Sequence, residues 1–381
     1  MPADPLDTGL ALSGGGYRAM LYSLGSVWRL NELGWLRRLD VVTSVSGGSI
    51  LNGVLATRWP QLEWNAAGVA TNFPAVVAQP VRAIASRTLD VFAGLEGLLS
   101  IFSTIADKVT QAYDEQLFHG AKLQSGIPPF EKGRTPRFVF YATSLQTGSS
   151  VRIERKRLAD WRIGEIPDPD LPVARVVCAS SAFPPVLSPV ALDVDPGAWR
   201  ELPGAELFAR DAFRKRLLLT DGGVYDNMGL EAIWDRCSTV LVSDAGAPLD
   251  ADPDPPADWT RQAIRVLDIV SEQTRALRRR KLLEDFQQSG DIAPSAARRK
   301  GTYWGIRTRI DDYGVANPLV RDNARTQALQ HIRTRLNEFE PAEQGELINW
   351  GYALADAAMR RYVDRENAAP AAWPVPEHAL S

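Results

Sequence analysis

The sequence predicts an α/β protein with three layers, in which helices cover both faces of a mostly parallel central sheet of about six strands. Short apolar runs are each followed by a turn and then by apolar residues at helical spacing, an alternation typical of parallel sheets. The chain has 381 residues, of which 45% are hydrophobic and 23% are charged. It can therefore bury the core of one large domain or of two ordinary ones.

The first two strand and helix units each contain a turn of small residues. Glycines occupy positions 14–16, and the sequence Ser-Gly-Gly occupies positions 46–48. Adjacent parallel strands would bring both turns to the same edge of the sheet. The elements expected around them are a strand at 8–12, a helix at 17–33, a strand at 39–45 and a helix at 49–59.

The strand pattern stops at residue 60 and returns near residue 137. Residues 60–132 are therefore expected to form a helical insertion, in which apolar side chains repeat at intervals of three and four between Val91 and Val109. We expect this stretch to pack inside the protein, and a lid that touches the membrane is the alternative. The further strands are expected at 137–142, 173–177, 216–220 and 239–243.

Residues 249–256 form a linker rich in Asp, Pro and Ala. The sequence therefore divides into an α/β domain, residues 1–250, and a mainly helical C-terminal extension, residues 251–381, which is expected to pack on the core. The elements expected in this extension are helices at 259–288, 323–338 and 342–363, and a short strand at 304–310.

Composition limits the partners and the compartment. A net charge of −3 gives no general attraction to nucleic acid. Cys178 and Cys237 lie in apolar surroundings and match no metal-ligand spacing, so we expect buried, reduced thiols and neither metal nor cofactor. The N-terminus lacks the pattern of a signal peptide, and no run of about 18 apolar residues occurs. A cytoplasmic protein that does not span the membrane is expected.

The glycine-rich turn allows two interpretations. Gly14-x-Gly16-x-x-Ala19 fits a dinucleotide-binding fingerprint, which also needs a carboxylate at the end of the second strand to hold the ribose. Asp40 instead lies at the start of that strand, hence at the opposite edge of the sheet. The amides of Gly14, Gly15 and Gly16 are therefore expected to bind the negative oxygen that forms when a carbonyl is attacked.

Ser46 follows the second strand, with Ser44 and Gly48 two positions to either side. A serine at such a corner between small residues is typical of a nucleophile elbow, in which a strained backbone holds the hydroxyl clear of the chain. Gly47 follows it, and the expected helix begins directly behind, with an N-terminus that favours negative charge. A simple helix cap is the alternative role for Ser46.

A nucleophilic serine needs a base, and the usual one is histidine. His119, His331 and His378 lie at none of the expected strand ends, so a Ser-His-Asp triad is not expected. Asp221 ends an apolar strand and precedes two glycines, which places its carboxylate at the same edge as Ser46. A turn aspartate is the alternative role for Asp221.

Four segments of the chain resemble motifs of the patatin-like phospholipases and of the related cytosolic phospholipases A2. The segment SGGGYRA resembles the oxyanion loop of that family, SVSGGS its nucleophile elbow, and DGGVYDNMGLE its aspartate motif. ASSAFPPVLSPV resembles a further segment that lies between the last two. The four segments begin at Ser13, Ser44, Ala179 and Asp221 in the family's order, and the resemblance spans residues 8–247.

The resemblance implies a patatin-like fold and a catalytic dyad of Ser46 and Asp221. It also implies an oxyanion hole formed by the amides at 14–16, and places Arg18 near an anionic head group, although Arg18 could instead pair with Asp226. The sequence departs from the family pattern at Ser44, where the first elbow glycine is usual.

The expected activity is therefore hydrolysis of fatty-acyl ester bonds of phospholipids or lysophospholipids, through an acyl-enzyme and without calcium. The alternatives are a non-catalytic sensor that binds lipid or nucleotide, and an acyltransferase. The expected partner is lipid, with transient contact at the membrane surface. Basic residues at 275–281 could attract anionic head groups there, or could form a solvated face balanced by Glu272, Glu284 and Asp285.

Overall fold

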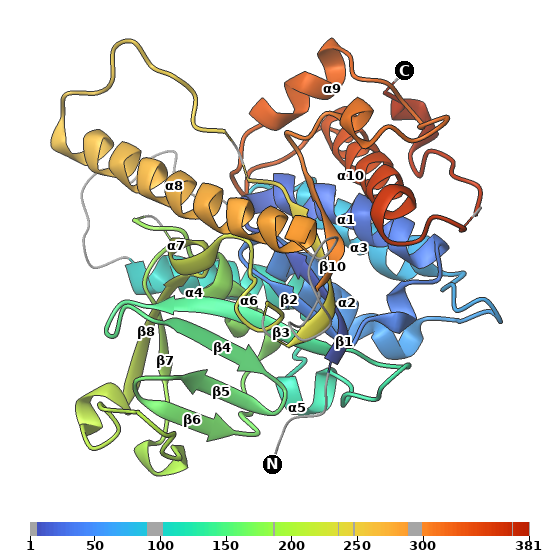
Figure 1. Cartoon of the computed structure of the whole chain (residues 1–381). Coiled ribbons are helices and arrows are strands. Elements are labelled where there is room, and N and C mark those ends of the chain that lie inside the picture. Colours follow the sequence, from blue (N-terminus) through green and yellow to red (C-terminus); the bar gives the residue numbers. More distant parts are fainter. Residues whose placement is uncertain are drawn as a thin grey trace.

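The protein's computed structural model describes residues 6–89, 102–185, 187–234, 236–246, 248–288, 299–367 and 369–380. Within these ranges ten strands form one sheet, and helices cover both faces of its parallel part (Figure 1). The parallel strands, in spatial order, are β10 (Lys300–Gly305), β9 (Cys237–Asp244), β1 (Leu6–Leu12), β2 (Val41–Ser44) and β3 (Arg137–Ser144). The predicted three-layer α/β fold is confirmed, with more than six strands.

Alternate residues of the parallel strands face two separate cores. Leu10 and Leu12 of β1 belong to the larger core, together with the buried faces of the helices that follow β1 and β2. Ala11 faces the other way, into a smaller core that includes Leu282 of the long helix shown in gold in Figure 1. Because successive side chains of a strand point to opposite faces, this near-continuous apolar run is what a sheet covered on both sides requires.

Five further strands extend the sheet in antiparallel fashion. They are β4 (Ser150–Glu154), β5 (Arg157–Asp160), β6 (Gly164–Pro167), β7 (Val190–Asp193) and β8 (Arg216–Asp221). The strand predicted at 173–177 is wrong, because these residues lie in helix α6 (Val173–Ser181). Almost all of α6 is buried, and a short, fully buried apolar run has no periodicity that separates strand from helix.

The longer helices lie close to their predicted positions. The α-helices besides α6 are α1 (Gly16–Glu32), α2 (Gly47–Arg58), α3 (Gln79–Ala85), α4 (Phe102–Tyr113), α5 (Leu123–Gly126), α7 (Gly223–Asp226), α8 (Trp259–Gln288), α9 (Ala324–Ala328) and α10 (Pro341–Tyr362). The helix predicted at 323–338 is much shorter, and the predicted strand at 304–310 is β10, which begins earlier and joins the central sheet. In the described ranges, no helix combines the length and apolarity needed to cross a bilayer.

Helices α1 and α10 approach each other closely. A Cβ at Gly25 would lie 1.8 Å from the carbonyl oxygen of Ile348, and one at Gly351 would lie 1.9 Å from that of Tyr22. Glycine at both positions lets the two backbones come into contact. Residues beyond 250 thus pair with the central sheet and pack on its first helix; the boundary at residue 250 remains a proposal.

The predicted apolar stretch of the insertion is described in part. Val91, Leu95 and Leu98 lie outside the described residues, whereas Ile105 and Val109 on α4 are buried. Next to Ile105, the carbonyl of Ala106 accepts a hydrogen bond from the thiol of Cys178 on α6 (3.4 Å). The described part of this stretch therefore packs inside the protein.

One detail of the sheet brings distant segments together. β2 ends at Ser44, opposite Phe140 of β3, and β8 ends at Asp221, opposite Ala142 of the same strand. β4 occupies the other edge of β3 over these residues, so β2 and β8 share one edge and run toward each other. Their carboxyl ends meet head-on, two β3 residues apart, or about 7 Å.

Candidate active site

The backbone at Ser46 is strained. Its φ and ψ angles are 53° and −122°, a combination that a residue with a side chain rarely adopts. Ser46 occupies the N-cap position of α2, yet its side chain makes no capping hydrogen bond. A simple helix cap therefore does not account for this serine. The turn holds the hydroxyl away from its own backbone, as a nucleophile requires.

The glycine-rich turn lies directly against this serine. A Cβ at Gly14 would lie 3.0 Å from the Cβ of Ser46. A Cβ at Gly47 would lie 1.9 Å from the carbonyl oxygen of Gly16, and one at Gly48 would lie 2.5 Å from that of Leu12. Small residues after Ser46 thus allow the two turns to touch, since any side chain there would push them apart.

The three glycine amides are not equivalent. The N–H of Gly14 donates to the carbonyl of Asn227 (2.9 Å), so it is already engaged and is a poor candidate for an oxyanion donor. Gly15 is the N-cap residue of α1 and Gly16 its first residue, where N–H groups have no acceptor within the helix. Among the described residues neither N–H makes a backbone hydrogen bond. Gly15 and Gly16 therefore remain as candidate donors.

The Asp221 carboxylate is almost completely removed from water, with 2% of the residue exposed. Its Oδ1 accepts a hydrogen bond from the N–H of Gly223 (2.7 Å). Burial raises the pKa of Asp221 to about 6, although the Gly223 N–H and the nearby Ser46 hydroxyl both act to lower it. Oδ2 is buried and meets no partner at good hydrogen-bond geometry among the described residues. Asp221 is thus a desolvated carboxylate with capacity to accept a proton beside Ser46.

Ser44 has a structural role that glycine could not perform. Its Oγ accepts hydrogen bonds from Oγ of Ser49 and Nδ2 of Asn52, both at 2.9 Å, and lies 3.2 Å from the carbonyl oxygen of Val139. The hydroxyl thereby joins the end of β2 to α2 and β3. This departure from the family pattern adds a buried hydrogen-bond network behind the elbow.

Ser180, at the end of α6, links the two halves of the candidate site. Its carbonyl accepts hydrogen bonds from the N–H of Ser46 and of Gly222, both at 3.2 Å. Its Oγ also accepts a hydrogen bond from the Ser46 N–H (3.1 Å) and lies 2.8 Å from Oγ of Ser49. We did not predict this role, although the segment ASSAFPPVLSPV that contains Ser180 was recognisable in the sequence.

Replacing Ser180 with alanine is expected to lower kcat for a soluble ester about ten-fold and to leave KM nearly unchanged, because the side-chain link that holds the elbow is lost. Ser181→Ala is a matched control, since that hydroxyl bonds to Val177 and Tyr113 instead. Threonine at position 180 should restore part of the rate. Equal loss of kcat in both alanine variants would contradict a specific positioning role.

The head-group role predicted for Arg18 does not fit the structure. The residue is 1% exposed, and its guanidinium donates hydrogen bonds to the carbonyls of Ala245 (2.6 Å), Ile332 (2.8 Å) and Gln330 (3.1 Å). Burial lowers the pKa of Arg18 to about 10. Among the described residues Asp226 pairs with Arg278 and not with Arg18. Arg18 instead fastens the start of α1 to the C-terminal part of the chain.

The positions of Asp40 and of two histidines argue against a dinucleotide-binding site and against a Ser-His-Asp triad. Asp40 accepts backbone hydrogen bonds from Asp7 and Thr8 at the amino edge of the sheet, far from a ribose site beside the glycine turn. His331 pairs with Asp250, and His378 packs against Gly345. Among the described residues, no group of three or more His, Cys, Asp or Glu side chains could hold a metal ion.

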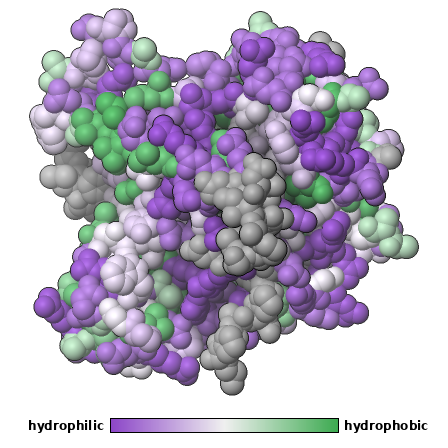
Figure 2. All heavy atoms as spheres, in the orientation of Figure 1, coloured by the Kyte–Doolittle hydropathy of each residue, from purple (hydrophilic) through white to green (hydrophobic). Residues whose placement is uncertain are grey.

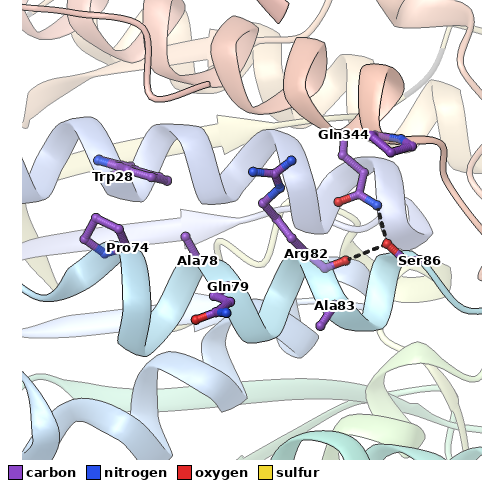
Figure 3. A pocket seen from close by; sticks show the side chains of 9 residues that line it. Trp28, Pro74, Ala78, Gln79, Arg82, Ala83, Ser86 and Gln344 are labelled. Atoms are coloured by element: carbon purple, nitrogen blue, oxygen red, sulfur yellow. Dashed lines mark hydrogen bonds between the residues drawn. The ribbon is translucent and has the colours of Figure 1, made fainter. Parts of the chain in front are cut away.

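A hollow of about 390 Å³ lies between α1, α3 and the start of α10 (Figure 3). Its lining residues include Trp28, Arg82 and Gln344, and the amide of Gln344 donates to Oγ of Ser86 (2.9 Å). Neither Ser46 nor Asp221 lines it. This hollow is therefore separate from the candidate active site.

The fold is similar to that of a known lipid-cleaving enzyme. Human GIVD cytosolic phospholipase A2 superposes with a TM-score of 0.52 at 12% sequence identity, over 92% of this chain and 61% of that one. VipD from Legionella pneumophila gives a TM-score of 0.38 at 16% identity, over 93% of this chain and 66% of that one. The chain thus spans less than two thirds of the length of either protein. At these identities the likeness to the human enzyme shows a shared fold.

A family model described as patatin-like phospholipase matches residues 10–234, which is more than half of the chain. The chain therefore belongs to the patatin-like phospholipase family. No curated protein sequence matches it significantly.

Proposed function

We propose that this protein is a serine acyl hydrolase that cleaves fatty-acyl ester bonds of phospholipids or lysophospholipids. Family membership supports lipid acyl hydrolysis. The single observation that carries the proposal is the head-on meeting of β2 and β8, which sets Ser46 beside the buried carboxylate of Asp221. Nothing in the proposed chemistry requires calcium or an organic cofactor.

In the proposed reaction the carboxylate of Asp221 takes up a proton twice and releases it twice. Asp221 accepts the proton of Ser46 as Oγ attacks the ester carbonyl carbon, and the N–H groups of Gly15 and Gly16 hold the resulting oxyanion. The intermediate collapses to an acyl-enzyme, and the alcohol leaves with the proton from Asp221. Water then attacks the acyl group while Asp221 accepts its proton, and Ser46 departs as the free hydroxyl once it is reprotonated.

Labelling by a fluorophosphonate tests this proposal, because an activated serine hydroxyl reacts readily with such reagents. We expect one covalent adduct, which peptide mass spectrometry locates at Ser46, and we expect no adduct in Ser46→Ala. Ser49→Ala is a control from the same helix, although some slowing is expected because Ser49 supports the elbow. An adduct at another residue, or none on the folded wild-type protein, would refute the proposal.

The same experiment separates the alternatives. A sensor that binds lipid or nucleotide would show no adduct, whereas an acyltransferase would form the same acyl-enzyme as a hydrolase. Product analysis then distinguishes the last two, since a hydrolase releases free fatty acid and a transferase moves the acyl group to an added alcohol. We further propose that the protein acts in the cytoplasm and contacts membrane lipid transiently.

A further inference from the structure

Helix α8 exposes an unusual amount of apolar surface. Eleven large hydrophobic side chains are exposed among the described residues, and six of them lie on this helix. Trp259, Leu277 and Val270 are 82%, 59% and 56% exposed. Figure 2 shows an apolar area at the upper left, where Figure 1 places the N-terminal half of α8. Exposed apolar patches of this kind usually mark a binding surface.

The exposed residues form a stripe along one side of the helix. Trp259, Val266, Val270 and Leu277 follow one another at intervals of seven, four and seven, which places them on a single face. The opposite face packs on the protein through residues such as Leu282. The stripe therefore has no partner within the described part of the chain.

The C-terminal half of the same helix is basic. Helix α8 contains seven basic and four acidic residues, in a chain whose net charge is −3. Three of the five basic residues in the C-terminal half are neutralised: Arg275 pairs with Asp244 and Glu272, Arg278 with Glu231, and Lys281 with Asp285. Arg279 and Arg280 form no ion pair among the described residues. Arg280 is exposed, whereas Arg279 is half-buried and lies on the face of the helix opposite the stripe, near the buried Tyr303.

The helix is also close to the candidate active site. Arg275 lies 2.9 Å from Asp244 at the carboxyl end of β9, and Arg278 lies 2.9 Å from Glu231, the last residue of the aspartate motif. The guanidinium of Arg278 also stacks over the ring of Tyr225. These contacts fix α8 beside the edge of the sheet from which Ser46 and Asp221 project.

We propose that the exposed face of α8 binds an anionic lipid surface, with the apolar stripe at the acyl boundary and Arg280 at the head groups. This inference rests on the proposed function and names the surface by which the enzyme meets its substrate. Tryptophan favours the membrane interface, and nearby arginines are attracted to anionic lipid.

Vesicle sedimentation of the full-length protein tests the proposal. Ser46→Ala, which prevents lipid turnover, should sediment with vesicles of phosphatidylcholine that contain about one-quarter phosphatidylserine, and much less with phosphatidylcholine alone. In this background Arg280→Gln should weaken binding about five-fold. Arg210→Gln, which removes one exposed charge before β8, is the matched control and should bind normally.

The apolar stripe is tested separately. Val270→Gln/Leu277→Gln and Trp259→Gln should each weaken vesicle binding about ten-fold, because less apolar area enters the interface. Trp161→Gln, at an exposed turn after β5, is the control for the tryptophan. In the active protein all of these variants should hydrolyse a soluble short-chain ester at the wild-type rate. That result separates loss of docking from loss of the proposed chemistry.

Two outcomes would overturn the inference. One is vesicle binding that the α8 variants leave unchanged. The other is a wild-type dimer that Val270→Gln/Leu277→Gln converts to monomer while vesicle binding persists, which would assign the stripe to contact between copies. Failure of Ser46 to label with a fluorophosphonate, by contrast, would refute the proposed function and leave lipid binding by α8 intact.

Discussion

Asp221→Asn is expected to abolish ester hydrolysis, with a fall in kcat of about 10⁴-fold, because the amide cannot accept the proton of Ser46. The substitution keeps the shape of the side chain, and its amide oxygen can still accept the hydrogen bond from Gly223. Thermal unfolding at pH 7 should occur at the same or a higher temperature, since a buried charge is removed. Residual turnover near the wild-type rate would exclude Asp221 as the base.

The raised pKa of Asp221 predicts opposite effects of pH on rate and stability. The base acts when deprotonated, so kcat/KM for a soluble ester should rise with pH and reach half its maximum near pH 6. The folded protein holds this proton more tightly than the ordinary value of 3.8 would allow. The stability from this group is therefore complete below about pH 4 and is lost as pH rises past 6. A rate midpoint near 4 would contradict a desolvated base.

Gly47→Ala is the second substitution with a large expected effect. The added methyl group would lie 1.9 Å from the carbonyl oxygen of Gly16 and 2.8 Å from its carbon, so one of the two turns must move. Displacing an oxyanion donor costs about 100-fold or more in turnover, and we expect a fall of at least this size.

Gly197→Ala provides the control for Gly47→Ala. A Cβ at Gly197 would meet nothing closer than 3.3 Å, at a side-chain oxygen of Asp195. Turnover of a soluble ester and the thermal midpoint should both be measured for each variant. If Gly47→Ala loses stability but keeps its rate, the contact between the two turns does not position the donors.

The turns of the candidate site could be predicted from the sequence because each follows an apolar run and carries small residues. Ser46 and the glycine-rich turn were predicted to lie close together because each follows one of two adjacent parallel strands. In the structure β1 and β2 are paired in this way. Asp221 was expected at the carboxyl edge of a parallel strand, whereas β8 is antiparallel to β3 and reaches Ser46 from the opposite direction. Strand direction depends on distant pairing, which local periodicity does not encode.

Two errors have the same origin. Residues 173–177 were assigned to a strand because a buried apolar run has no visible period. Arg18 was given a head-group role because the family resemblance implied it, yet its guanidinium donates to three carbonyls from distant segments. In both cases tertiary packing decides the outcome. The neighbouring residues in the sequence do not indicate this packing.

The hydrogen bonds from Arg18 to the C-terminal part of the chain limit how far the chain can be shortened. A Cβ at Gly16 would lie 1.6 Å from the carbonyl oxygen of Thr334, and the N–H of Tyr17 donates to Arg335 (3.3 Å). The residues that pack behind the proposed oxyanion donors thus lie about a hundred positions past the end of the family match. A shortened fragment that stops with that match would keep Ser46 and Asp221 but lose the residues that pack behind the glycine-rich turn, so we expect it to lack the proposed activity.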